Sequence, residues 1–312
     1  MHKIVVSVPD EELLQSVRQR VDPATVELLL WDMREAAPRS TIDIVVPPYL
    51  NAEPLLTRLN GVATQLVQWQ SIGYNAVGQY LPKGHRLANA ATVHETATAE
   101  LAVGLAIAAQ RELPRFVRQQ GRGQWHGGTT RALADRRVLL VGYGGVGKAI
   151  AQRLRAFEVD LTCVASTARL EELPGGDTVQ VHGIAELPQL LPEAEIVILA
   201  VPLTTHTRGL LGAAQLALLP DDALLVNVAR GAVVHTAELL AELRTGRIRA
   251  ALDVVDPEPL PPQHELWQLP NVLLTPHAGG DADVMLPRIT ALVVRQIAAL
   301  LAGEQPENIV TP

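Results

Sequence analysis

The sequence has very little cysteine and few aromatic residues. Of its 312 residues only one, Cys163, is a cysteine, and 3% are aromatic. A single cysteine excludes an internal disulfide and a cysteine metal cluster, which is typical of a protein of the reducing cytoplasm. With so few aromatic side chains, we expect leucine, valine and alanine to fill the core.

The sequence also lacks an excess of basic charge. It contains 26 lysines and arginines against 33 aspartates and glutamates, which gives a formal net charge of −7 at pH 7. A protein that binds nucleic acid needs clustered basic residues to neutralise phosphates. We therefore expect no nucleic-acid partner.

Long apolar runs are absent as well. The amino-terminal letters "MHKIVVSVPDEE" reach acidic residues before an apolar run of signal length develops, and "LAVGLAIAA" is too short to span a bilayer. We therefore expect a soluble, cytoplasmic protein with no membrane partner. A chain of 312 residues suits two domains, each with its own core.

What the sequence does contain is an alternation of short apolar runs with helical patterns. Apolar, β-branched runs occur at 3–8, 41–48, 137–142, 159–164, 194–201, 223–229, 249–255 and 271–276. Helical spacing occurs at 10–20, 147–157 and 235–246, between runs of this kind. Strands that are apolar throughout favour parallel sheets buried on both faces, and hence an α/β fold.

Two further helical patterns bear on the domain organisation. Residues 91–114 have a long helical pattern, which we interpret as a joint between two lobes, and the turn-rich letters "GRGQW" follow it. A second amphipathic helix follows the last apolar run and is predicted to end at Gly303, which would cap it.

The clearest motif follows the apolar run at 137–142. Gly142, Gly144 and Gly147 have the spacing G-x-G-x-x-G and stand between a predicted strand and a predicted helix. In this context the glycines allow a tight turn, a close approach of backbone to a pyrophosphate, and packing of the helix on its strand. The motif therefore predicts a dinucleotide site at a helix N-terminus.

Two other interpretations of these letters compete. Gly142, Gly147 and Lys148 match part of a P-loop, but Ala149 stands where a P-loop needs a serine or threonine for magnesium. The glycines could also form a turn and nothing more, as they often do when such a triplet stands alone.

Three later segments carry polar residues at the ends of apolar runs. They are "LLVNVARGAVV", "AALDVVDPEPL" and "VLLTPHAGG", and they contribute an arginine, a glutamate and a histidine. Parallel sheets bind ligands at the carboxyl ends of their strands, so these side chains should meet. Such a set suits an anionic substrate, because a guanidinium binds a carboxylate with two hydrogen bonds and a carboxylate beside an imidazole favours its protonated form.

With these segments in place, the chain resembles the D-isomer-specific 2-hydroxyacid dehydrogenases over nearly all of its length. The motifs that carry the resemblance are "VGYGGVGKAI", "VPLTTHTRGLL", "VNVARGAVV", "ALDVVDPEPLP" and "LTPHAGG", in the family's order and spacing. The resemblance implies two doubly wound parallel-sheet domains, with a Rossmann-type nucleotide-binding domain (98–282) inserted in a flavodoxin-like substrate domain (1–97 and 283–312). It also implies a homodimer.

The resemblance assigns roles to individual residues. Arg230 corresponds to the residue that binds the substrate's carboxylate and carbonyl, and His277 to the acid/base that protonates the carbonyl oxygen as a hydride leaves the nicotinamide. Glu258 corresponds to the acid that pairs with this histidine and keeps its pKa high enough to donate a proton. Ile72 and Gly73, in "QSIGYNAV", correspond to a loop whose backbone N–H groups hold the substrate carboxylate.

The same resemblance implies a set of cofactor contacts and a substrate class. The implied contacts are Gly142, Gly144, Gly145, Val146, Gly147, Pro202, Thr207, Val228 and Asp253. Formate-oxidising members lack an acid at the position of Glu258, so we expect a 2-oxo or 2-hydroxy acid as substrate. The letters "SIGYN" and "TATAELAV" are most similar to the glyoxylate and hydroxypyruvate reductase branch.

Structural explanations exist for several of these residues. Arg230 could form a surface ion pair, and His277 could cap a helix or lie in the core. The pairs His94–Glu95 and His264–Glu265 begin like zinc motifs, but the second histidine of such a motif is missing, so we expect no metal. Only the joint pattern favours function.

The cofactor prediction depends on an acid that the sequence lacks. In dinucleotide folds the second strand usually ends in an acid that binds the ribose hydroxyls and selects NAD. That position falls on Ala165, and Ser166, Thr167 and Arg169 follow it. These residues can bind a 2′-phosphate, which favours NADP over NAD. Alternatively, the loop has lost selectivity and binds both cofactors, or Arg169 points into solvent.

Two other functions compete with a 2-oxoacid reductase. One is a non-enzymatic NAD(P)H sensor resembling a corepressor, which would need the glycine loop but not Arg230, Glu258 and His277 together. The other is a dehydrogenase of amino acids or secondary alcohols. An arginine with backbone amides suits a carboxylate and offers nothing to an ammonium group.

Overall fold

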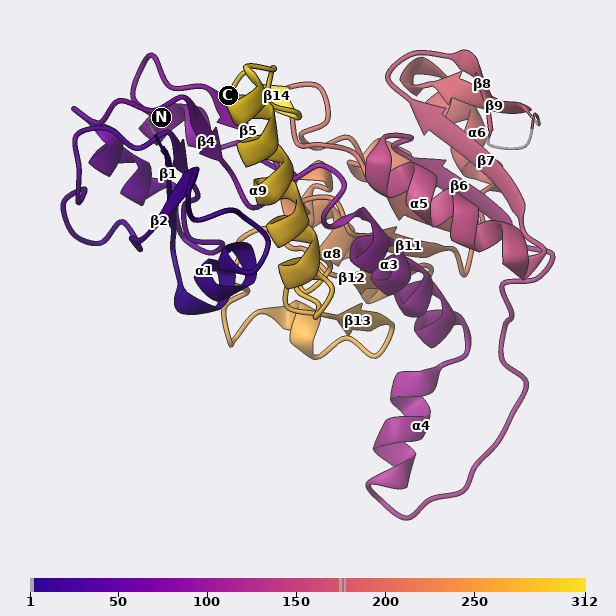
Figure 1. Ribbon diagram of the computed structural model, residues 1–312. Helices are drawn as coiled ribbons and strands as arrows, with labels where there is room; N and C mark the ends of the chain where they lie inside the picture. The colour runs from indigo at the N-terminus through magenta and orange to yellow at the C-terminus, as the bar shows by residue number, and fades with distance from the viewer. Residues whose placement is uncertain (1–2, 174–175, 177) are drawn as a thin grey trace. The chain divides into compact units, whose positions relative to one another are not determined.

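The chain forms two compact units in the computed structural model, which describes residues 3–173, 176 and 178–312 (Figure 1). Unit 1 consists of Met1–His94 and Ala282–Pro312, and unit 2 of Glu95–Asp281. The first two residues of unit 1 lie outside the described part of the chain. The expected domain boundaries at 97/98 and 282/283 stay predictions.

Unit 1 is built on a six-stranded sheet with the order β14-β5-β4-β3-β1-β2. The order 2-1-3-4-5 is that of flavodoxin-like folds, and β14 pairs with β5 in the antiparallel direction. Its strands and helices are β1 (Ile4–Val8), α1 (Glu11–Arg18), β2 (Val26–Leu30), β3 (Ile44–Val45), β4 (Leu66–Gln68), α2 (Val77–Tyr80), β5 (Leu87–Ala88), α9 (Met285–Ala302) and β14 (Ile309–Val310).

Unit 2 is built on an eight-stranded sheet with the order β13-β12-β11-β10-β6-β7-β9-β8. Its elements are α3 (Glu95–Gln110), α4 (Leu113–Gln120), β6 (Arg137–Val141), α5 (Gly145–Leu154), β7 (Asp160–Ala165), β8 (Arg169–Glu172), β9 (Thr178–Gly183), α6 (Leu187–Leu190), β10 (Ile196–Leu199), α7 (Ala213–Leu218), β11 (Leu224–Asn227), α8 (Thr236–Thr245), β12 (Arg249–Leu252) and β13 (Val272–Leu274). All neighbouring strands run parallel except β8, which is antiparallel to β9. The expected α/β class is confirmed.

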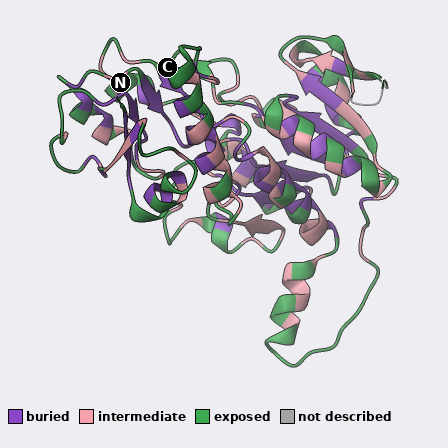
Figure 2. Ribbon diagram, in the orientation of Figure 1, coloured by how far each residue is buried: buried purple, intermediate pink, exposed green. Residues whose placement is uncertain are grey.

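Alternation along the strands builds a core on each face of both sheets. In β6, Val138 and Leu140 pack on the face covered by α3 and α5, whereas Leu139 and Val141 pack on the face covered by α7 and α8. In β1, Val6 and Val5 belong to different cores in the same way. Figure 2 shows the strands of both sheets as largely buried. Burial on both faces explains why these strands are apolar throughout.

Helix ends follow local chemistry. Asp10 caps α1, because its carboxylate accepts a hydrogen bond from the N–H of Leu13 at 2.8 Å. Gly303 ends α9 in the left-handed conformation with φ of 72°, so the predicted C-cap is confirmed. The long pattern at 91–114 is broken in the structure: Glu112 has φ of 52° and precedes a separate helix, α4.

Helix α9 is long and apolar enough to cross a membrane by length and composition alone. The core helix of a soluble protein passes the same test. In unit 1, Ile289, Leu292, Val293 and Ile297 on α9 are buried and pack with residues of α1 and β1. Its apolar face therefore belongs to the core of unit 1.

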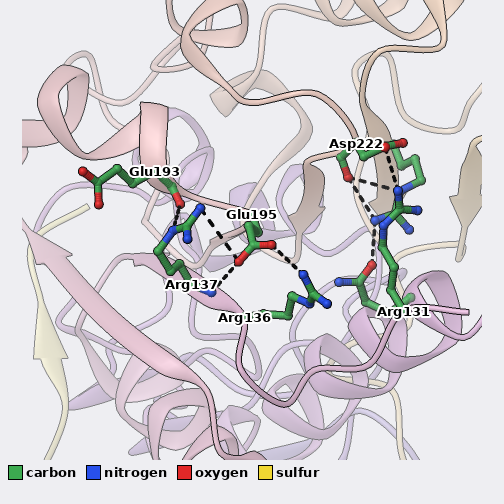
Figure 3. A network of polar contacts seen from close by, with 8 residues as sticks. Arg131, Arg136, Arg137, Glu193, Glu195 and Asp222 are labelled. Carbon is green, nitrogen blue, oxygen red and sulfur yellow. Dashed lines mark hydrogen bonds and ion pairs between the residues drawn. The ribbon is translucent and has the colours of Figure 1, made fainter.

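An ionic network lies at the amino ends of the parallel strands in unit 2 (Figure 3). Arg136, just before β6, donates to the Glu195 carboxylate at 2.7 Å, and the N–H of Arg137 donates to its other oxygen at 3.1 Å. Burial is the largest single influence and raises the pKa of the Glu195 carboxyl, but these two hydrogen bonds and the positive charges of Arg136 and Arg137 together lower the pKa. Arg131 pairs with Asp222, just before β11, at 2.6 Å. Charges thus hold together the edge of the sheet opposite its carboxyl ends.

Candidate active site

The glycine loop lies where the strand order of unit 2 reverses. Strand β6 has β7 on one side and β10 on the other, and the chain continues from β6 to β7 and later to β10. Such a switch point opens a crevice at the carboxyl ends of the strands, where open α/β sheets bind ligands. Residues 142–144 connect the end of β6 with the start of α5 at this point.

Each glycine of the motif has its own steric reason. Gly142 has φ of +111°, and a Cβ there would lie 2.5 Å from the carbonyl of Ala200 after β10. A Cβ on Gly147 would lie 1.8 Å from the oxygen of Gly142. In contrast, a Cβ on Gly144 would meet no described atom within 4 Å. Gly142 and Gly147 therefore allow the tight turn. Gly144 leaves open space in front of the N-terminus of α5, and this space fits a dinucleotide pyrophosphate.

Arg230 lies in the segment after β11, next to the loop after β12. Gly231 allows this proximity, because a Cβ at that position would lie 1.8 Å from the oxygen of Val255. The Arg230 guanidinium donates to the oxygen of Ala229 at 2.7 Å, and the Asn227 amide donates to the oxygen of Arg230 at 3.1 Å. These contacts fix the backbone that carries the arginine.

His277 and Glu258 meet as the sequence predicts. The Nδ1 atom of His277 lies 2.5 Å from the Oε1 atom of Glu258, although 19 residues separate them in the chain. Both side chains are partly exposed, at 43% and 35%. Because Nδ1 is engaged, Nε2 is the ring nitrogen available for proton exchange with a ligand.

A buried carboxylate holds the loop that carries His277. Asp253 is 3% exposed and follows β12. Its carboxylate accepts hydrogen bonds from the Thr275 hydroxyl at 2.6 Å and from the N–H groups of Ala278 and Gly279 at 2.8 and 2.9 Å. His277 itself has φ of 55°, an uncommon conformation for a residue with a side chain, and it donates its N–H to the oxygen of Asp253 at 2.8 Å.

Asp253 therefore acts on the position of His277. The sequence predicts this residue only as a contact of the cofactor, and that role stays a prediction. The sequence gives part of the signal for this positioning role, because Asp253 follows an apolar run. It does not give the three hydrogen-bond donors, which come from a segment more than 20 residues away.

The remaining predicted cofactor contacts lie at strand ends or just beyond them. Val228 follows β11 and is buried, whereas Pro202 lies beyond β10 and accepts a hydrogen bond from the Thr207 hydroxyl at 2.5 Å. Gly145 and Val146 lie in the first turn of α5. Their roles as cofactor contacts stay predictions.

The segment after β7 differs from the sequence-based expectation in one respect. Ser166 and Thr167 are exposed after Ala165, as expected of a loop. Arg169, however, begins strand β8, which forms a hairpin with β9 that the sequence pattern does not predict. Its guanidinium donates to the Glu171 carboxylate at 2.9 and 3.1 Å and to the oxygen of Tyr143 in the glycine loop at 3.3 Å. The alternative in which Arg169 points into solvent does not fit these contacts.

Ile72 and Gly73 belong to unit 1, apart in the chain from the residues above. They lie in the segment after β4. The oxygen of Ile72 accepts a hydrogen bond from the Asn89 amide at 2.9 Å, and the oxygen of Gly73 accepts one from the Trp69 indole at 3.0 Å. These bonds fix the backbone of the loop, and its predicted role in holding a carboxylate stays a prediction.

Metal ligation finds no structural support. Within residues 3–173, 176 and 178–312, no group of three or more histidine, cysteine, aspartate or glutamate side chains could hold a metal ion. His94 instead stacks on Tyr49 with ring centroids 5.6 Å apart, and its Nε2 atom lies 2.6 Å from the oxygen of Gln70.

The open space at Gly144 yields a prediction. Gly144→Ala should leave the thermal unfolding temperature nearly unchanged, because the new methyl group meets no described atom, but it should weaken dinucleotide binding by at least about tenfold by filling the space in front of α5. Calorimetric titration with NADP and NAD measures the second effect.

Gly147→Ala is the matched comparison. Its methyl group would overlap the Gly142 carbonyl, so it should lower the free energy of unfolding by about 3 kcal/mol. Unchanged dinucleotide binding by Gly144→Ala would show that the open space does not receive the pyrophosphate.

Comparisons with known proteins place the chain in one family. The family model described as "D-isomer specific 2-hydroxyacid dehydrogenase, NAD binding domain" matches residues 103–279. The chain is 31% identical to a glyoxylate reductase of Pyrococcus horikoshii over 312 aligned positions, covering 91% of this chain and 89% of that protein. It is 32% identical to D-3-phosphoglycerate dehydrogenase of Methanocaldococcus jannaschii over 73% of this chain, and the match spans only 43% of that longer protein.

A solved structure shows the same architecture. The D-isomer-specific 2-hydroxyacid dehydrogenase of Xanthobacter autotrophicus Py2, crystallised in complex with NADPH and MES, superposes with a TM-score of 0.81 and 29% identity over 100% of this chain and 99% of that chain. The family expected from the motifs is thereby confirmed. The chain belongs to the D-isomer-specific 2-hydroxyacid dehydrogenases.

Proposed function

We propose that the protein reduces small 2-oxo acids such as glyoxylate or hydroxypyruvate to the 2-hydroxy acids with a nicotinamide cofactor. The observation that carries the proposal is the pair formed by His277 and Glu258 at 2.5 Å, at the same sheet edge as the glycine loop and Arg230. A relative that matches over most of its length, in Pyrococcus horikoshii, is named a glyoxylate reductase. A pure sensor would need the glycine loop but no acid/base pair.

The residues divide the reaction between them. Bound NAD(P)H supplies a hydride to the carbonyl carbon of the substrate. Arg230 binds the substrate's carboxylate and carbonyl oxygen, and His277 donates the Nε2 proton to that oxygen as it becomes a hydroxyl. Glu258 orients the ring through Nδ1 and stabilises its protonated form. In the reverse direction, His277 accepts the hydroxyl proton.

We further propose that NADP is preferred over NAD. No acid ends β7, where Ala165 stands, and the following residues, Ser166, Thr167 and Arg169, offer donors to a 2′-phosphate. Arg169 is held beside the glycine loop through Tyr143. The related structure from Xanthobacter autotrophicus was obtained with NADPH.

A homodimer and a cytoplasmic location complete the proposal. The arm formed by residues 111–131 contains α4, none of whose residues is buried (Figure 2). Trp125 is 98% exposed and Val117 66%. The arm carries five arginines and one acid in a chain of net charge −7, so the rest of a second copy offers the opposite charge. The exposed apolar side chains of the arm favour burial against a partner.

The catalytic pair is tested by substitution. His277→Ala should lower kcat/KM for glyoxylate by roughly 100- to 10,000-fold without changing the dissociation constant of NADPH, because it removes the proton donor and not a cofactor contact. Glu258→Gln should lower kcat as well, and the double variant should lose less than the two effects combined, since the residues act as a unit.

His182→Ala is the control for this pair. The Nδ1 atom of His182 lies 2.8 Å from Glu186, so the variant removes a similar histidine–glutamate pair elsewhere in unit 2. If His182→Ala and His277→Ala lowered activity equally, the assigned role of His277 would be wrong. Wild-type protein inactive on every small 2-oxo acid, yet binding NADPH, would favour the sensor.

The cofactor preference is tested by steady-state kinetics with glyoxylate. We expect a higher kcat/KM with NADPH than with NADH, and Arg169→Ala should raise the KM for NADPH by roughly tenfold while leaving that for NADH nearly unchanged. Arg244→Ala removes the comparable exposed ion pair between Arg244 on α8 and Glu265, and it should change neither value. Higher efficiency with NADH, or an equal effect of Arg169→Ala on both cofactors, would contradict the preference.

The homodimer is tested by analytical ultracentrifugation. Wild-type protein should sediment as a dimer, and the double variant Val117→Ser/Trp125→Ala should shift toward the monomer, because it removes exposed apolar contacts of the arm. Leu30→Ser removes an exposed apolar side chain of unit 1 and should leave the dimer intact. Monomeric wild-type protein would contradict the proposal.

A further inference from the structure

One carboxylate lies between two cations beside the glycine loop. The Oε1 atom of Glu171 lies 2.5 Å from the Nζ atom of Lys148, and its Oε2 atom accepts hydrogen bonds from Arg169 Nη2 at 2.9 Å and Nε at 3.1 Å. Lys148 comes from α5, whereas Arg169 and Glu171 come from β8. The Glu171 side chain is 20% exposed, less than that of either cation.

Both cations lie next to Tyr143 in the glycine loop. Lys148 directly follows the third glycine of the motif, and its ammonium group lies 6.0 Å from the centre of the Tyr143 ring. Arg169 donates to the backbone oxygen of the same tyrosine at 3.3 Å. They therefore lie near the end of β7, the position at which dinucleotide folds distinguish a ribose hydroxyl from a ribose phosphate.

The carboxylate is ionised at neutral pH. The hydrogen bond from Lys148 is the largest influence on the Glu171 carboxyl, and together with the bond from Arg169 it lowers the pKa despite the opposing effect of burial. At the pH at which NADPH would bind, the two cations are thus already paired with an anion of the protein itself.

We propose that Lys148 and Arg169 together form the 2′-phosphate site and that Glu171 is an internal anion that competes with the phosphate for it. Glu171 then determines how strongly the protein prefers NADPH over NADH. This inference rests on the proposed function, because it requires that the glycine loop bind a nicotinamide dinucleotide.

Binding of a 2′-phosphate at this site requires an exchange of anions. A 2′-phosphate carries a charge of about −1.5 to −2 near neutrality and offers three acceptor oxygens, so it cannot share the two cations with an ionised carboxylate without strong repulsion. Glu171 has to leave the pair when the phosphate binds. NADH brings no such phosphate, so the ion pairs with Lys148 and Arg169 can persist when it binds.

A positioning role for Glu171 predicts the opposite result. If the carboxylate mainly held Lys148 and Arg169 in place for the phosphate, its removal would weaken the binding of phosphorylated ligands. Competition predicts that its removal strengthens that binding. The sign of the change therefore distinguishes the two roles.

The test is calorimetric titration of the full chain with 2′,5′-ADP, which carries the 2′-phosphate, and with 5′-AMP, which does not. Glu171→Gln should bind 2′,5′-ADP about tenfold more tightly than wild type does, with 5′-AMP binding unchanged. Lys148→Met should bind 2′,5′-ADP about tenfold more weakly and also leave 5′-AMP binding unchanged. Circular dichroism verifies that each variant is folded.

Two control variants match these substitutions. Glu172→Gln changes the next residue of β8, which is exposed, and Lys83→Met changes an exposed lysine of unit 1. Neither should alter the binding of either nucleotide, and an effect of Glu172→Gln equal to that of Glu171→Gln would overturn the inference as a general charge effect.

The remaining outcomes separate this inference from the proposed function. Weaker or unchanged binding of 2′,5′-ADP by Glu171→Gln overturns the competition, and unchanged binding by Lys148→Met overturns the role of the lysine. In either case, wild-type binding of 5′-AMP and NADPH leaves the proposed function standing. If wild-type protein binds none of these nucleotides, the proposed function is wrong and this inference is wrong with it.

Discussion

Parallel pairing of the strands in unit 2 is the constraint on which the candidate site depends. Strands that run in the same direction, packed on both faces by helices, bring all their carboxyl ends to one edge. The glycine loop, Arg230, Glu258 and His277 follow four different strands and still meet at that edge. Segments separated by more than 100 residues can therefore contribute to one chemical site, while the ionic network around Glu195 holds the opposite edge.

At this edge, the buried Asp253 carboxylate holds in place the loop that carries the His277 imidazole. It accepts three hydrogen bonds from the segment 275–279, and each of these donors would lose its partner without it. Leaving buried donors unsatisfied costs on the order of 1–3 kcal/mol each. The donor at Gly279 is buried and the other two are partly buried, so the three bonds together oppose the cost, about 1–3 kcal/mol, of the left-handed conformation of His277.

Much of the larger sheet could be predicted from the sequence, because its signals are local. A buried parallel strand is apolar over its whole length, and the turn after β6 needs glycines at fixed positions. The contact between Glu258 and His277 is not local. The position of both residues after apolar runs of a parallel sheet predicts that they meet, and the family resemblance assigns Glu258 as the partner of His277.

Other features could not be predicted from the sequence because their causes lie in tertiary structure. The letters "VELLL" of β2 pair with β1 at a sheet edge and lack a periodic signal of their own. The break between α3 and α4 includes the left-handed backbone of Glu112, a conformation that this residue type does not predict. Glu171 follows Ala165 by only six residues, yet the β8–β9 hairpin turns its carboxylate back toward Lys148 on α5. Counting residues along the sequence from Ala165 therefore does not predict that Glu171 contacts residues beside the glycine loop.

The composition of unit 1 has a consequence for the order of folding. Its core combines Ile4 and Val6 on β1 with Leu292 and Val293 on α9, and β14 supplies a strand beside β5. During synthesis from the amino terminus, residues 3–94 emerge long before these partners do, whereas unit 2 is contiguous and can form its core without waiting. We therefore expect the middle of the chain to become structured during synthesis while its first segment still exposes apolar surface. Chaperones that recognise such surface would act on β1 and α1 in that interval.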